Sequence, residues 1–170
     1  MDKNDEMISK QEAFAQVKSM IKRTALIHYA FAKTLIDELG DEKGRELTQK
    51  AVLLYGSLVG KEAKEKAEKK GLSPGAENYQ DDLPSLGWHH REKVVVDGEK
   101  RSRVYTCYLA EVWKEMGAAE LGRIYCYVDQ AKFSAFNPEL ECVHVKNVLD
   151  GDPYCELAVR PKKKAKQLPP

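Results

Sequence analysis

The feature that most constrains the fold is a change in hydrophobic periodicity near the middle of the chain. From about 11 to 39, apolar residues recur at spacings of three, four and seven, which is typical of one face of a helix. Ser9 with Glu12 forms a capping box, and Gly40 supplies a C-terminal stop. A second helix is predicted from about 42 to 70, antiparallel to the first because the connection is short. Its inward-facing residues are expected to be Leu47, Ala51, Leu54 and Leu58.

Beyond a glycine- and proline-containing loop at 71–87, the pattern favours strands. Two hairpins are expected, one turning at Asp97-Gly98 and the other at Asp150-Gly151. Their predicted strands are 89–96 with 100–105 and 140–148 with 154–160. Helices are predicted between the hairpins at about 109–116 and 119–136, broken at Gly117, although 123–128 would also suit a strand.

These elements predict an α+β fold. An N-terminal antiparallel helix pair packs with a four-stranded antiparallel sheet made of two hairpins, with helices between the hairpins. The length of 170 residues suits one domain. We expect that domain to span 1–160, with a helical half at about 9–71 and a mixed half at about 88–160. A disordered basic tail is expected at 161–170.

Composition and charge exclude several classes of protein. The 28 basic and 27 acidic residues nearly cancel, which argues against a nucleic-acid binder. The longest uncharged run, 51–60, is far short of the roughly 20 apolar residues that a membrane span needs. The N-terminus lacks the shape of a signal peptide, so a cytoplasmic location is expected.

Cys107 is the first candidate for chemistry. It is expected at the start of a helix, where the helix dipole would lower the pKa of its thiol. Glu111, one helical turn later, would orient a substrate amine or take a proton. The alternative interpretation is a buried structural cysteine beside an exposed glutamate.

Cys126 and Asp129 form the second candidate pair. In a helix they share a stripe with Phe133 and Phe136, and a carboxylate on such a stripe is costly unless it is paired. Asp129 is therefore a candidate base or substrate anchor. The alternative is a partly exposed or capping aspartate. Asn137, before a proline, ends the segment and offers an amide to a polar ligand.

The histidines indicate function less clearly than Cys107, Cys126 and Asp129 do. His28 lies on the inner stripe of the first helix, which favours a core role. His90 is a candidate substrate-binding residue, although His89 and His90 should point to opposite faces of a strand. His144 alternates with Cys142 and should share its face. Because the usual ligand spacings are absent, no metal site is predicted, and a divalent cofactor is left open.

The C-terminal half resembles a known family in an ordered series of short motifs. They are Cys107–Glu111, Met116-Gly117, Glu120–Gly122, Tyr125-Cys126 with Asp129, Phe136–Pro138, and Gly151-Asp152 with Cys155. This series is similar to that of the L-2-amino-thiazoline-4-carboxylic acid hydrolase family. Many relatives are expected to have proline after the first cysteine, where this chain has Tyr108.

The resemblance implies a small-molecule hydrolase that opens a cyclic amidine to an N-carbamoyl product. Cys107 would be the nucleophile, with Cys126 as the alternative, and Asp129 the anchor or base. Glu111, Asn137 and His90 would bind substrate. A non-catalytic small-molecule or metal-binding module is the second hypothesis. The third is an interaction protein that uses its first two helices and exposes an apolar face on them; a homo-oligomer is left open.

Overall fold

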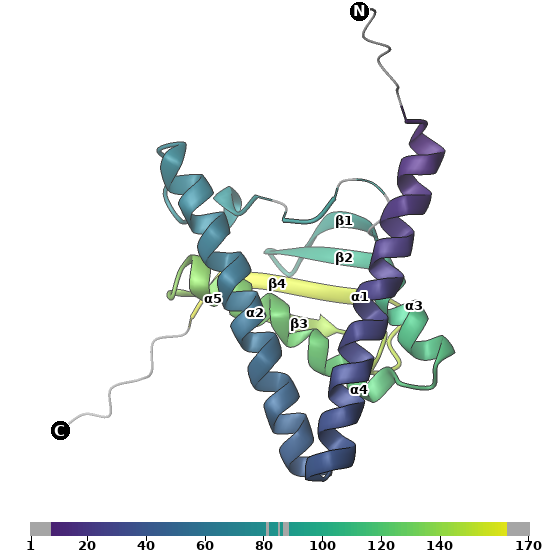
Figure 1. Ribbon diagram of the computed structural model, residues 1–170. Helices are drawn as coiled ribbons and strands as arrows, with labels where there is room; N and C mark the ends of the chain where they lie inside the picture. The colour runs from purple at the N-terminus through teal and green to yellow at the C-terminus, as the bar shows by residue number, and fades with distance from the viewer. Residues whose placement is uncertain (1–7, 81, 85, 87–88, 163–170) are drawn as a thin grey trace, which may run out of the picture.

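The computed structural model describes residues 8–80, 82–84, 86 and 89–162. Two long helices, α1 (Lys10–Leu39) and α2 (Asp41–Lys69), come first and diverge from the turn at Gly40 like the arms of a V (Figure 1). The Ser9 hydroxyl accepts a hydrogen bond from the Glu12 N–H at 3.1 Å, as the capping pattern predicts. Gly40 has φ 82°, a conformation that favours glycine.

The buried face of α2 differs from the prediction. Its buried residues are Gly44, Thr48, Val52, Gly56, Gly60, Ala63 and Ala67. Ala51, Leu54 and Leu58 are exposed and Leu47 is only half-buried, so the expectation of an inward-facing stripe at these positions is wrong.

Close packing of α2 on α5 (Tyr127–Phe136) is the physical reason. A Cβ added to Gly60 would lie 2.2 Å from the Lys132 carbonyl oxygen, and one added to Gly56 would lie 2.6 Å from that of Val128. Only glycine lets two backbones approach this closely. The face of α2 that packs on α5 is thus its small one, which a search for large apolar residues does not find.

The sheet has the predicted composition of two antiparallel hairpins. Its strands are β1 (His89–Val96), β2 (Glu99–Cys107), β3 (Leu140–Lys146) and β4 (Cys155–Pro161), in the spatial order β1-β2-β4-β3. Asp97 and Gly98 both have positive φ, 51° and 78°, as the tight turn of the first hairpin requires. The predicted α+β fold is confirmed.

Three helices connect β2 to β3. They are α3 (Tyr108–Glu115), α4 (Ala119–Tyr125) and α5, and the predicted break at Gly117 is present, with φ 65°. The segment 123–128 is helical except for a turn at Cys126, and no part of it is a strand.

The helices form layers on one face of the sheet. α1 packs on α3 and α4, α2 packs on α4 and α5, and α5 in turn lies on β3 (Figure 1). Ile21 and Ala25 of α1 meet Leu109 and Trp113 in one core cluster. His28 is a satisfied core histidine, because its Nε2–H donates to the Leu121 carbonyl at 2.8 Å.

The structure differs from the prediction at the end of the second helix and at the start of the C-terminal tail. Ala63 and Ala67, in the highly charged last turns of α2, are buried with Phe136 and Leu140. Pro161 belongs to β4, and the Lys162 N–H donates to the Glu139 carbonyl, so these two residues are not part of a disordered tail. Residues 163–170 of that tail lie outside the described part of the chain. None of the described helices has the length and apolar character needed to cross a bilayer.

Candidate active site

The candidate site forms where α4 ends and α5 begins. The Cys126 N–H bonds to the Arg123 carbonyl at 3.2 Å, and the Asp129 N–H bonds to the Cys126 carbonyl at 3.3 Å. These three-residue spacings are tighter than those of an α-helix, so the helical path is interrupted at Cys126. Asp129 lies in the first turn of the new helix, next to the β3 strand.

Asp129 is held by two cationic or polar partners. One carboxylate oxygen lies 3.1 Å from Lys132 Nζ and the other lies 3.1 Å from His144 Nε2. Lys132 also contacts Asp82, with 3.2 Å between Nζ and Oδ2. The three charged groups, two carboxylates and one ammonium, leave one negative charge in this part of the protein.

The partners of Asp129 keep it ionised. Burial by itself would raise the pKa of the Asp129 carboxyl, but the charge of Lys132 and the hydrogen bond from His144 outweigh it and lower the pKa to about 2. The side chain lies deep in the fold and is still 24% exposed, so it borders a space that water reaches. Asp129 is therefore a permanent, accessible anion at neutral pH.

Asn147 determines the tautomer of His144. The Asn147 Oδ1 accepts the Leu149 N–H at 2.9 Å, so its Nδ2 is the atom that lies 3.0 Å from His144 Nδ1. Because the amide donates there, Nδ1 is the acceptor and Nε2 carries the proton that is donated to Asp129. Asn147 is 1% exposed and also hydrogen-bonds to Cys126, so it joins the histidine to a thiol.

All four cysteines gather around Asp129. Burial is the main cause that raises the pKa of each thiol, and the negative charge of Asp129 raises it further; the four are Cys107, Cys126, Cys142 and Cys155. The pKa of Cys107 rises to about 11 and that of Cys126 to about 12. These thiols are thus protonated at neutral pH. Cysteines from β2, the junction of α4 and α5, β3 and β4 lie near one carboxylate.

The environment of Cys107 corrects one expectation. The thiol does stand at the start of α3, and the N–H groups of Ala110 and Leu109 act to lower its pKa. Burial outweighs them, so the net shift is upward and the predicted activation by the helix terminus is not what this environment produces.

Three other candidate residues lie elsewhere. Glu111 is exposed and lines a shallow pocket between α1 and α3 with Lys18 and Lys22. The amide of Asn137 is engaged on both sides, because Nδ2 donates to the Pro74 carbonyl and Oδ1 accepts the Glu139 N–H, each at 2.9 Å. Among the described residues, no contact joins Glu111 or Asn137 to Asp129.

His90 lies on the far face of the sheet. Its ring is 5.7 Å from that of Tyr105, whose hydroxyl donates to Glu92. Tyr105 hydrogen-bonds to Arg103, and Arg103 bonds to Glu156. Glu156 precedes Leu157, the residue paired with His144, and neighbours along a strand point to opposite faces. The sheet therefore separates His90 from Asp129.

The comparison with protein families identifies the chain. The family model described as L-2-amino-thiazoline-4-carboxylic acid hydrolase matches residues 18–159. The chain belongs to this family. The matched range contains Asp129 and every cysteine, so the site described above lies wholly within the part that defines the L-2-amino-thiazoline-4-carboxylic acid hydrolase family.

Other comparisons add little. No curated protein matches the chain. Among solved structures, it is similar to a trafficking protein particle complex subunit 3 from Naegleria fowleri, covalently bound to palmitic acid. The identity is 16%, the match covers 85% of this chain and 98% of that one, and the TM-score is 0.48.

Sequence reasoning missed part of this hydrolase-family site. Lys132 follows Asp129 by three residues, so the i,i+3 spacing on one helix was a signal for the ion pair. Asp82 and Asn147 come from loops and carry no such signal. His144 and Cys142 do share a face, as predicted, since both lie beside Asp129.

The site offers no evident metal centre. Within the described residues, no three His, Cys, Asp or Glu side chains are arranged to hold a metal ion.

Proposed function

We propose that the chain is a hydrolase that opens the thiazoline ring of L-2-amino-thiazoline-4-carboxylate, a cyclic amidine, to an N-carbamoyl product. The family supports the reaction class. The observation that carries the proposal is the accessible Asp129 carboxylate, held ionised in the middle of four thiols.

Asp129 is proposed to anchor the substrate. A protonated amidine is a planar cation with N–H donors that match a carboxylate. The cluster of Asp82, Asp129 and Lys132 has one uncompensated negative charge, which an amidinium would neutralise. A general base works best with a pKa near the working pH, so a pKa of about 2 favours the anchoring role over the basic one.

Cys107 is the proposed nucleophile, and Cys126 is the alternative. The sulfur adds to the amidine carbon, the ring carbon–sulfur bond breaks, and the thiol proton passes to the departing ring sulfur. Water then adds to the same carbon. Its oxygen becomes the carbamoyl oxygen, and one proton goes to the imino nitrogen. The bond from the carbon to the cysteine sulfur breaks, and the other proton restores the cysteine thiol.

The bound cation would help to form the nucleophile. The pKa of the Cys107 and Cys126 thiols is raised partly by the charge of Asp129. An amidinium beside that carboxylate offsets the charge and so lowers the pKa of the thiols again. The substrate thus takes part in activating the group that attacks it.

Binding without catalysis is the second candidate, and one observation favours it. Each of the four thiols has a raised pKa, as expected for structural cysteines. In this case Asp129 would bind an amidine-like cation that is released unchanged.

Thiol release from L-2-amino-thiazoline-4-carboxylate distinguishes the two candidates. The wild-type protein is measured beside Cys107→Ala, Cys126→Ala and Cys142→Ala, with and without divalent metal. Loss of turnover in the first or second variant alone supports covalent hydrolysis. Full turnover in both would contradict the covalent step, and absence of turnover in every sample, combined with saturable binding of the ligand, would favour a binding protein.

We also infer that the reaction takes place in the cytoplasm. All four cysteines are free, which suits a reducing compartment.

A further inference from the structure

Large apolar side chains stand on the outer faces of both long helices. Six of them, each between 48% and 66% exposed, form what we name the α1–α2 stripe: Met20, Ile27, Phe31, Leu54, Tyr55 and Leu58. On the same two helices, the residues turned inward are mostly glycine and alanine. The usual distribution of size between the core and the surface is therefore inverted here.

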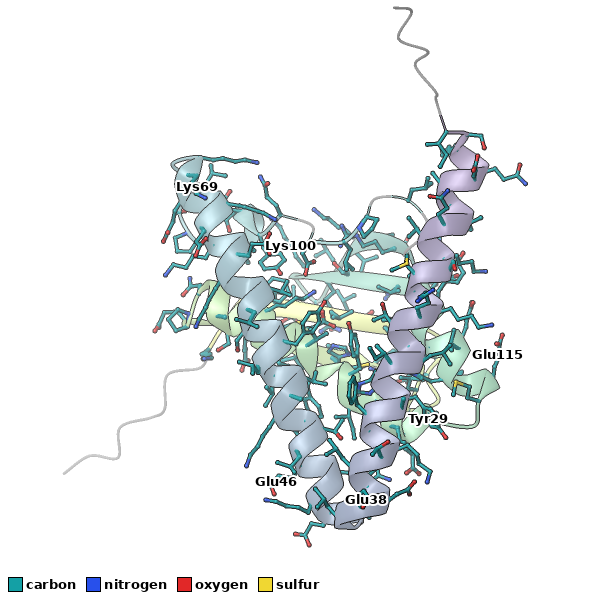
Figure 2. All side chains as sticks on the ribbon, in the orientation of Figure 1. Tyr29, Glu38, Glu46, Lys69, Lys100 and Glu115 are labelled. Carbon is teal, nitrogen blue, oxygen red and sulfur yellow. The ribbon has the colours of Figure 1, made fainter. Side chains whose placement is uncertain are left out.

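The two halves of the stripe lie at one level of the V. The ring of Tyr125 on α4 lies between the helices, 5.2 Å from the His28 ring of α1 and 6.3 Å from the Tyr55 ring of α2. Phe31 follows His28 by three residues and Leu54 precedes Tyr55, so these side chains belong to the same height of the arms. In Figure 2, Glu38 and Glu46 mark the closed end of the V below them.

The fold prevents α2 from turning its large residues inward. The backbone contacts of Gly56 and Gly60 with α5 leave no room for a side chain on that face. A rotation of the helix that buried Leu54 and Leu58 would also move these glycines away from Val128 and Lys132, and would separate α5 from α2. The stripe is left for an occupant outside the monomer.

The charges around the stripe suit a second copy of the chain. The run 51–60 of α2 contains no charged residue, and Lys50, at its start, pairs with Glu46 of the same helix. On α1, the only charged residues between Met20 and Phe31 are Lys22 and Arg23, so few charges lie beside the stripe. A net charge of +1 for the whole chain likewise permits self-association.

The exposed area of the stripe is close to the area that each partner buries in a standard dimer interface. A large side chain has roughly 200 Å² of surface, so the six together present on the order of 700 Å² of exposed surface. The largest apolar patch on a typical monomer is about 300–600 Å². A standard interface buries about 800 Å² on each partner. We propose that the α1–α2 stripe is the interface of a two-fold symmetric homodimer, in which the same patch of each copy faces the other.

Sedimentation equilibrium of the full chain tests the proposal. At concentrations of tens of micromolar, we expect the wild-type protein to have twice the 19.2 kDa mass of one chain. Leu54→Glu and Phe31→Glu should each yield 19.2 kDa species with an unchanged far-UV circular dichroism spectrum, because both side chains face outward. The milder Leu58→Gln should weaken the dimer at least tenfold and serves if a glutamate variant does not fold.

Val95→Glu is the matched control. Val95 is as exposed as the stripe residues and lies on β1, away from both helices, so this variant should remain dimeric. A wild-type protein that is monomeric at 100 µM would overturn the proposal, and so would a Val95→Glu variant that dissociates as readily as Leu54→Glu.

Discussion

A buried and a half-buried carboxylate lie on opposite faces of the sheet, and their surroundings differ. Glu156 of β4 is 2% exposed, and its two oxygens each accept a hydrogen bond at 2.7 Å, one from Arg101 and one from Arg103. Asp129 is 24% exposed, shares Lys132 with Asp82, and lies near enough to all four thiols for its charge to raise their pKa. Hydrogen bonds from arginines lower the pKa of Glu156, whereas Asp129 owes its low pKa to one lysine and one histidine.

We propose that this difference separates a structural carboxylate from one that can bind a ligand. Glu156 has a surplus of cationic partners and almost no contact with water, so it has nothing left to offer a ligand. Asp129 belongs to a cluster with an excess of negative charge and keeps a surface that water reaches. A lowered pKa is common to both, so this property alone does not mark a functional site.

The largest expected effect is on turnover. Asp129→Asn removes the anchoring charge at constant shape, and we expect a loss of about 10²-fold or more in kcat/KM for L-2-amino-thiazoline-4-carboxylate. Glu156→Gln should keep kcat/KM within a few-fold and instead destabilise the fold by about 3 kcal/mol, because two arginines lose their counter-charge. Equal losses of turnover in both variants would remove the distinction.

Packing beneath Asp129 offers the second test. Gly60→Ala places a Cβ against the Lys132 carbonyl, and we expect destabilisation of about 2 kcal/mol together with a raised KM, measured by urea unfolding and steady-state kinetics. Lys61→Ala, an exposed change in the same turn, should alter stability by no more than about 0.5 kcal/mol. A Gly60→Ala variant as stable as the wild type would contradict the close α2–α5 contact.

Acid unfolding tests whether the Asp129 carboxylate is held ionised. The folded pKa of Asp129, about 2, lies below the ordinary value of 3.8, so ionised Asp129 contributes stability above pH 4 that is lost as the pH falls toward 2. The contribution is about 2 kcal/mol. Asp129→Asn should flatten this part of the stability profile, measured by urea unfolding at each pH. A profile identical to that of the wild type would mean that Asp129 is not held ionised.

Thiol reactivity should show the smallest effect. With pKa values of about 11 and 12, Cys107 and Cys126 should react slowly with iodoacetamide at pH 8. Asp129→Asn removes a charge that raises both values, so labelling followed by mass spectrometry should be a few-fold faster. Glu156→Gln should leave the labelling rate unchanged, and fast labelling of the wild-type protein below pH 8 would show that Cys107 is activated after all.

Local patterns predicted most of the fold. The capping box at Ser9, the Asp97-Gly98 turn and the break at Gly117 are short-range features, and each depends on backbone preferences of a few residues. The order of motifs from Cys107 to Cys155 was enough to predict the family. Asp129 was also singled out correctly as a carboxylate in need of partners, since that argument needs only its stripe.

The tertiary structure decided which faces are buried and which groups meet. The small face of α2 is inward because α5 approaches its backbone, and no pattern within α2 encodes the distance to another helix. The pKa of Cys107 depends on the balance of burial against a helix terminus, and burial arises from distant elements. His144, Asn147 and Asp82 join Asp129 only because chain folding brings them there. The sequence therefore determined the elements and the candidate residues, while long-range packing determined the charge, protonation and accessibility of the site.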